Sequence, residues 1–199
     1  KVGVSRVTVI KLLNDAKAKG IVSVRINPSV ASKTNTSKHL AQKFGLTSSM
    51  IIPDNDELPL TERIGKAGAF AISEALCKGD VIGVAWGRTV LSVARNVALE
   101  RSFADLTVVQ VCASPNGLSA DFSPELCASL LANNLGARSV SLMAPAIVSS
   151  SELRSLLLQE PTIRNQLKVI KSANKVVFGV GELGKGATLR SSELYDEAT

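Results

Sequence analysis

The sequence predicts an α/β protein whose main domain, from about residue 49 onward, is a doubly wound, mostly parallel sheet. Short aliphatic runs recur along the chain, and stretches with helical periodicity lie between them. Strands that are apolar on both faces and alternate with helices are typical of a parallel sheet covered on both sides. The length of 199 residues fits one such domain with a small appendage.

The expected strands and helices alternate along this domain. Predicted strands lie at 50–53, 80–85, 106–112, 139–143 and 175–180. Predicted helices lie near 60–77, 88–100, 123–135 and 151–173, and Pro161 is expected to break the last one. Aromatic residues make up only 4% of the chain, so the core is expected to be aliphatic.

The composition excludes several classes of protein. With 45% hydrophobic and 20% charged residues, the chain is globular rather than disordered. It contains neither an apolar run long enough for a membrane helix nor a secretory signal pattern. Cys77, Cys112 and Cys127 form no CxxC pair, and His39 is the only histidine. We therefore expect a cytoplasmic chain without a disulfide, a metal site or another cofactor.

The N-terminal segment contains a predicted helix over 5–20. Ser5 is a candidate N-cap, Gly20 is a candidate stop, and the apolar residues between them repeat at helical spacing. This apolar face comprises Val9, Leu12, Leu13 and Ala16. Residues 21–26 alternate as a short strand would, and 27–37 are expected to be a polar linker. We also expect a further helix to precede residue 1.

The positive charge of the chain is concentrated in this N-terminal segment. Residues 1–25 hold six basic side chains and one acidic side chain, and so carry +5 of the formal net charge of +6. Such asymmetry points to an anionic partner, nucleic acid first, whereas charge alone favours a solvated basic helix. Ser5, Arg6, Thr8 and Lys11 lie largely off the apolar face and are the candidates for contacts in a DNA major groove.

Ligands of doubly wound sheets bind at the carboxyl ends of the strands, and the loop 85–89 is the first such place. A helix that starts at or after Gly87 offers free N–H groups and the positive end of its dipole, and Arg88 and Thr89 can donate to phosphate oxygens. We favour a phosphate site over the alternative of an ordinary turn with an exposed arginine. Trp86 either covers a ligand or packs on the domain.

Two further loops follow predicted strands. The loop 179–186 matches GxGxxG and nearly matches GxxxxGK[ST], but Gly186 stands where a P-loop needs a hydroxyl, and the preceding strand comes late in the domain. We expect it to line a small-molecule site rather than a nucleotide site. Cys112, Ser114 and Asn116 could bind sugar hydroxyls, although a buried apolar role is more common for a free cysteine. Cys77 and Cys127 are expected in the core.

Several segments of the chain resemble one known family. The segment 5–13 with 19–22 resembles a recognition helix and its exit strand, and the most specific block is Gly-Asp-Val-Ile-Gly-Val-Ala-Trp-Gly-Arg-Thr over 79–89. Phe44-Gly-Leu, Val108-Val-Gln, Ala144-Pro-Ala and Gly179-Val-Gly continue the match in order. Over nearly its whole length the chain is similar to the sorbitol-operon regulator (SorC) family of bacterial sugar-responsive transcriptional regulators.

This resemblance implies three parts. Residues 1–26 would be the C-terminal part of a helix-turn-helix, 27–48 a linker with a linker helix, and 49–199 a Rossmann-like effector domain, incomplete at its C-terminus and similar to sugar-phosphate isomerases. Members of the family bind a phosphorylated sugar or sugar-derived effector, form dimers and tetramers, and switch their affinity for operator DNA. The expected partners are therefore operator DNA, a phosphorylated sugar or polyol, and further copies of the chain.

The resemblance also assigns residues by position. Gly87, Arg88 and Thr89 would hold the phosphate of the effector. Segment 111–113 lacks the glycine-rich or basic residues that many relatives carry there. The expected contacts with the rest of the effector are Trp86, Gln110, Cys112, Ser114, Gly181, Glu182 and Lys185.

A sugar-phosphate isomerase or deaminase on the same fold is the alternative function. Such an enzyme needs a general base at the strand ends, and usually an acid as well. The loops 86–89 and 112–117 contain no carboxylate, and Asp80 belongs to the amino end of its strand. Asp121 and Glu182 are the remaining candidates, and the sequence shows no partner for either. The sequence therefore favours a binding protein over an enzyme.

Overall fold

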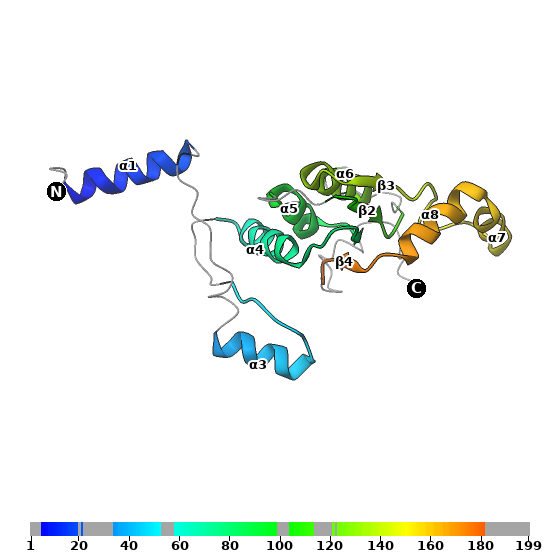
Figure 1. Cartoon of the computed structure of the whole chain (residues 1–199), viewed down its shortest axis with the longest axis horizontal. Coiled ribbons are helices and arrows are strands. Elements are labelled where there is room, and N and C mark those ends of the chain that lie inside the picture. The colour runs from blue at the N-terminus through cyan, green and yellow to red at the C-terminus, as the bar shows by residue number, and fades with distance from the viewer. Residues whose placement is uncertain are drawn as a thin grey trace. The chain divides into compact units, whose positions relative to one another are not determined.

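The computed structural model describes residues 5–19, 21, 34–52, 58–98, 104–113, 121 and 123–181. The chain divides into two compact units, one spanning residues 1–51 and the other residues 52–199 (Figure 1). The boundary lies close to the predicted start of the main domain. The first unit has only helices among its described residues, and the second has both helices and strands.

The first unit contains helices α1, Arg6–Ala18, and α3, Asn35–Phe44. The N-cap role predicted for Ser5 is confirmed, because its Oγ accepts the backbone N–H of Thr8 at 3.2 Å. The predicted stop at Gly20 and residues 22–26 of the strand expected at 21–26 lie outside the described residues, and Ile21 is not in a strand. Thr34 caps α3 by accepting the N–H of Ser37 at 3.1 Å. Because of this cap, the last residues of the expected polar linker, 35–37, are helical instead.

The second unit alternates helices and strands, as the sequence predicts. Its elements in chain order are α4 Leu60–Ala75, β1 Val81–Val84, α5 Arg88–Asn96, β2 Thr107–Gln110, α6 Pro124–Leu135, β3 Arg138–Val140, α7 Ser151–Gln159, α8 Pro161–Lys171 and β4 Lys175–Val177. The expected break at Pro161 is confirmed. Glu160 is extended between α7 and α8, and Pro161 takes the first helical position, where a missing N–H is tolerated.

The four strands form one parallel sheet with the order β3-β2-β1-β4. The chain moves outward from β1 to β3 and then returns to place β4 on the other side of β1. This reversal makes β1 and β4 the topological switch point. Val84 at the end of β1 lies opposite both Gln110 of β2 and Val177 of β4, so these three strands end together. The doubly wound α/β prediction is confirmed.

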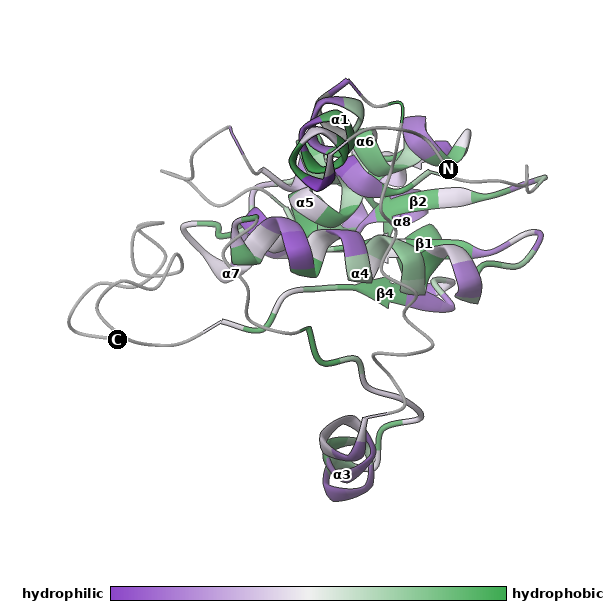
Figure 2. Cartoon of the chain, turned by 90° about the vertical axis from the view of Figure 1, so that its left-hand side faces the viewer, coloured by the Kyte–Doolittle hydropathy of each residue, from purple (hydrophilic) through white to green (hydrophobic). Residues whose placement is uncertain are grey.

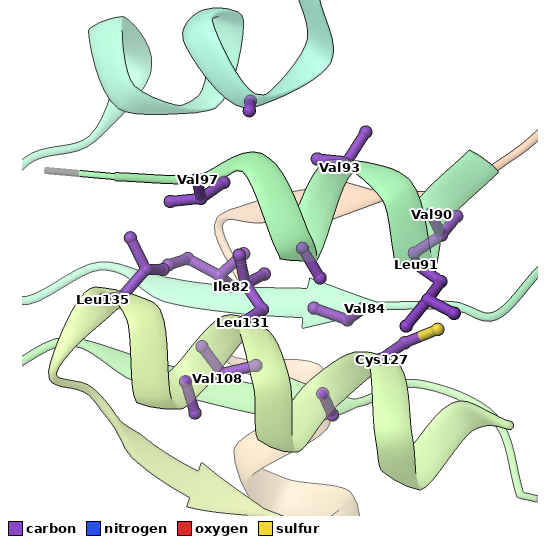
Figure 3. Packing of buried hydrophobic residues seen from close by; sticks show 14 of the residues in the cluster. Ile82, Val84, Val90, Leu91, Val93, Val97, Val108, Cys127, Leu131 and Leu135 are labelled. Atoms are coloured by element: carbon purple, nitrogen blue, oxygen red, sulfur yellow. The ribbon is translucent and has the colours of Figure 1, made fainter. Parts of the chain in front are cut away.

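The core lies between the sheet and helices α5 and α6 (Figure 3). Ile82 and Val84 of β1 and Val108 of β2 point into it and meet Val90 of α5 and Leu131 of α6. The fully buried cluster is aliphatic apart from the thiol of Cys127, as the low aromatic content predicts. Figure 2 shows the hydrophobic colouring that runs along β1 and β2, which is typical of strands covered on both faces.

Helix α4 approaches α5 very closely. A Cβ atom at Gly65 would lie only 2.7 Å from Cβ and 2.9 Å from the carbonyl carbon of Ser92, and one at Gly68 would lie 2.7 Å from a methyl of Val93. Glycine at these positions therefore lets the two helix backbones meet, which fixes α5 in place against its neighbour.

One predicted strand is wrong. Residues 50–52 of the strand expected at 50–53 have no strand conformation, and Pro53 lies outside the described residues. Met50, Ile51 and Ile52 are half-buried, and three aliphatic residues can be buried in this way without joining a hydrogen-bonded ladder. The other four strands expected in the main domain are present but shorter than expected by two or three residues, because the apolar runs extend beyond the paired segments.

Candidate ligand site at the carboxyl ends of the strands

The loop after β1 leads directly into the amino terminus of α5, which begins at Arg88. Gly87 has φ 124° and ψ 162°, a backbone conformation that residues with a side chain rarely adopt, and the space around its Cα is open. Gly87 has no side chain to cap α5, and its own N–H faces the sulfur of Cys127, so the N–H groups that follow Gly87 in the first turn keep their capacity to bind an anion. Arg88 is exposed and Thr89 is half-buried beside them, whereas Trp86 packs, half-buried, against the core.

The loop after β4 lies beside this helix terminus. A Cβ atom at Gly179 would be 3.8 Å from a methyl of Val90, which belongs to the first turn of α5. The carbonyl oxygen of Val177 accepts the N–H of Ala85 at 2.9 Å, so the two chain segments separate only beyond this bond. Gly181 is exposed, with open space around its Cα. The structure thus brings the loops expected at 85–89 and after 179 together at the switch point.

Gln110 ties three loops together at the end of β2. Its side chain is 0% exposed. The Nε2 amide donates to the carbonyl oxygen of Cys112 at 2.8 Å and to Oε1 of Glu125 at 3.0 Å. Its Oε1 accepts the N–H of Leu142, beyond β3, at 3.3 Å. Both donors of this buried amide and its oxygen are thus bonded to protein groups, which fixes the loops that follow β2 and β3.

Two thiols lie under the site. Cys127, on α6, is completely buried, and burial raises its pKa, while the backbone N–H of Gly87 and the charge of Arg95 act in the opposite direction. Burial, followed by the charge of Glu125 and the proximity of Cys127, raises the pKa of Cys112 to about 11. Both thiols are therefore neutral at ordinary pH, and Cys127 is part of the core as the sequence predicts.

We expect thiol reagents to discriminate between the cysteines at pH 8. Cys77 is exposed, contrary to its expected place in the core, because it lies just beyond the end of α4. With a pKa of about 11, only about one Cys112 in a thousand is a thiolate at this pH. Iodoacetamide should therefore modify Cys77 first, as peptide mass spectrometry would measure, and 8 M urea should make all three react. Equal rates for Cys77 and Cys112 in the folded protein would contradict the burial argument.

Glu125 is a carboxylate at the strand ends that the sequence analysis missed. It lies in the first turn of α6, which begins with Pro124 and is capped by Ser123, whose Oγ accepts the N–H of Leu126 at 3.2 Å. The Ser-Pro-Glu pattern marks such a helix start and could have located this carboxylate near the end of β2. Its exposed side chain is held by Gln110.

The remaining candidate residues from the sequence are not among the described groups at the carboxyl ends of the strands. Asp80 sits at the amino end of β1, as predicted, where it pairs with Lys175 at 2.7 Å. Asp121 is exposed and precedes α6. Ser114, Glu182 and Lys185 lie outside the described residues. Within the described ranges, no three His, Cys, Asp or Glu side chains gather as a metal site would require.

On α1, the candidate DNA-contacting residues are all exposed. The hydroxyls of Ser5 and Thr8 lie 2.9 Å apart and are hydrogen-bonded to each other at the start of the helix. Among the described residues, none of the helices is both long and apolar enough to cross a membrane.

Known proteins match this chain over most of its length. Residues 29–199 match the family described as "Putative sugar-binding domain". The chain is 33% identical over 186 residues to the uncharacterized transcriptional regulator YjhU of Escherichia coli, a match that covers 90% of this chain and 56% of that protein. It is 25% identical over 199 residues to the deoxyribonucleoside regulator of Bacillus subtilis, covering 99% of this chain and 63% of that protein.

A solved structure supports the same relationship. The full-length sorbitol operon regulator SorC of Klebsiella pneumoniae superimposes with a TM-score of 0.70 at 25% identity, covering 88% of this chain and 58% of that one. The chain thus spans about three-fifths of the length of these relatives. Because the family match covers most of the chain and the fold agrees, the chain belongs to the sugar-binding domain family of SorC-type transcriptional regulators.

Proposed function

We propose that this chain is the effector-binding part, with a portion of the DNA-binding region, of a regulator that responds to a phosphorylated sugar or polyol. The observation that carries the proposal is the uncapped amino terminus of α5 at the switch point, opened by Gly87 and bordered by Arg88. A helix amino terminus with a neighbouring arginine matches the charge and hydrogen-bonding needs of a phosphate. The relatives are themselves named as regulators.

The residues divide into three roles in this proposal. Gly87, Arg88 and Thr89 bind the phosphate, and Trp86, Cys112 and Gly181 border the rest of the ligand. Gln110 is buried and bonded within the protein, so we assign it a positioning role rather than direct contact. Ser114, Glu182 and Lys185 remain proposed contacts from the family resemblance.

The same arrangement favours binding over turnover. Isomerases and deaminases of sugar phosphates need a base and an acid placed around the substrate. Asp80 is at the opposite end of the sheet, and Glu125 is the carboxylate that the described strand ends offer. We therefore propose a regulator rather than an enzyme, in which the effector changes operator affinity or the assembly of dimers and tetramers.

A ligand panel tests the effector site. We expect hexitol and hexose phosphates to raise the melting temperature of the chain, whereas their unphosphorylated parents do not. A ligand at 100 times its Kd adds about 2.7 kcal/mol of stability, which is a shift on the order of 5–10 °C for a chain of this size. Equal shifts of the melting temperature with phosphorylated and unphosphorylated ligands would overturn the phosphate site. Conversion of a ligand to a product would overturn the role as a binding protein without catalysis.

DNA binding is tested through α1. The duplex DNA that contains the operator is first selected from a random library. Arg6→Ala is expected to weaken binding to this DNA and to reduce the slope of log binding constant against log salt concentration by about one. Arg164→Ala, an exposed arginine of α8 in the other unit, serves as the control. Fluorescence anisotropy across a salt series measures both quantities. An unchanged slope for Arg6→Ala would remove α1 from the DNA interface.

A further inference from the structure

We propose that Glu125 makes the site selective for ligands with one phosphate group, by accepting hydroxyl protons at the end of the ligand away from that phosphate and repelling a second anionic group there. This inference rests on the proposed function, because it assumes that the phosphate binds at the amino terminus of α5. It adds a specificity residue and a ligand class that neither the strand-end motifs nor the family match assigns.

The Glu125 carboxylate is held in one place. Its Oε1 is 3.0 Å from the Nε2 amide of Gln110, and Gln110 is completely buried with its remaining bonds made to Cys112 and Leu142. The amide orientation is dictated chemically, because only the nitrogen can donate to a carboxylate and to a carbonyl oxygen. An exposed glutamate is normally free to rotate away from a repelled group, but this anchor opposes that movement.

This carboxylate is held at the carboxyl end of β2, the strand next to the one whose loop carries the proposed phosphate position. Val84 and Gln110 are in register on neighbouring strands, so the loops that carry Gly87 and Cys112 start side by side, at a strand spacing of roughly 4.8 Å. Cys127, two residues after Glu125 on α6, is the residue whose sulfur faces the backbone N–H of Gly87. A ligand whose phosphate occupies the start of α5 can thus extend toward the start of α6.

The chemistry of the two ends is opposite. Arg88 and the N–H groups of α5 attract an anion, whereas an ionised carboxylate can only accept hydrogen bonds. The charge of Glu125 in the first turn of α6 is itself stabilised by the helix dipole. Hydroxyl or amino groups of a ligand can donate to it, but a phosphate or carboxylate cannot donate and meets a like charge.

The test compares matched mono- and bisphosphates by isothermal titration calorimetry with the full chain. The probes are fructose 6-phosphate with fructose 1,6-bisphosphate, and glucitol 6-phosphate with glucitol 1,6-bisphosphate. We expect the wild type to bind at least one monophosphate about tenfold or more tightly than its bisphosphate partner. Glu125→Gln keeps the size and the acceptor for Gln110 but removes the charge, and should bring the ratio to within about threefold.

Glu152→Gln is the matched control, because Glu152 is also a first-turn glutamate, on α7. It should leave the ratio unchanged. Equal or tighter binding of the bisphosphates by the wild type would overturn the inference, and so would an unaltered ratio in Glu125→Gln, while the proposed function would stand. Failure of every phosphorylated probe and of inorganic phosphate to bind the wild type would instead overturn the proposed function, and the inference with it.

Discussion

Replacing Asp80 with alanine is expected to lower the free energy of unfolding by about 3 kcal/mol, measured by urea denaturation. The Asp80 side chain is 4% exposed and accepts hydrogen bonds from Nζ of Lys175 at 2.7 Å, from the N–H of Cys77 at 2.7 Å and from Nδ2 of Asn174 at 2.8 Å. Removing one partner of a buried ion pair costs about 3–5 kcal/mol, and the partial exposure of Lys175 places the loss at the low end.

The exposed ion pair between Glu62 and Lys66 is the control for Asp80, and its Oε1 and Nζ atoms are 3.0 Å apart. Because both of its side chains are more than 40% exposed, Glu62→Ala should cost less than about 0.5 kcal/mol. If Asp80→Ala and Glu62→Ala had similar effects, the ion pair of Asp80 would not contribute to stability in the way its burial implies.

Asp80 also gives the stability a pH dependence with a defined sign. Burial acts to raise its pKa, but the hydrogen bonds from Lys175, Cys77 and Asn174 together outweigh burial and leave the pKa below its usual value. The stabilisation is therefore fully present above the unfolded pKa of about 3.9 and is lost as the pH falls through the lower folded value. Asp80→Asn should show a weaker loss of stability than the wild type below about pH 4.

Arg88→Ala is expected to lower the affinity for phosphorylated ligands by about 10- to 100-fold and to leave the affinity for their unphosphorylated parents unchanged. The reason is the loss of a charge-assisted hydrogen bond at the start of α5, which is worth about 1.5–3 kcal/mol. Calorimetric titration with both forms of one ligand measures the difference. Arg88→Lys keeps the charge but not the paired donors, and should fall between the wild type and Arg88→Ala.

Arg95→Ala provides a matched control for Arg88, since Arg95 is exposed in the last turn of the same helix. Its replacement should leave the affinity for phosphorylated ligands close to that of the wild type. An equal loss of affinity for the phosphorylated and unphosphorylated forms in Arg88→Ala would contradict a phosphate contact and would indicate a general disturbance of the loop.

The alternation of elements in the second unit could be predicted because it depends on local patterns. The aliphatic run of β1, the glycine before α5 and the proline that separates α7 from α8 act within a few residues of themselves. The strand expected at 50–53 shows the limit of this reasoning. A hydrophobic run records burial, but whether it joins a sheet depends on a partner strand that the run itself does not specify.

Contacts between distant residues could not be predicted in the same way. Asp80 meets Lys175 because β4 returns beside β1, and Gln110 meets Glu125 because α6 begins at a particular rotation over β2. No periodicity encodes either pairing. The predicted site residues stay predictions, although the fold brings Gly87, Arg88, Thr89 and the segment 179–181 to one end of the sheet.

The ion pair of Asp80 joins the amino ends of β1 and β4, opposite to the end where the ligand loops separate. Asn174 reinforces this junction, since its side chain bonds to both Asp80 and the N–H of Val81. The two strands are therefore fixed to each other along their whole paired length, from this buried charge to the hydrogen bond between Ala85 and Val177 at the other end. The loops that follow β1 and β4 thus start from a rigid base, and loss of the Asp80 ion pair would loosen that base.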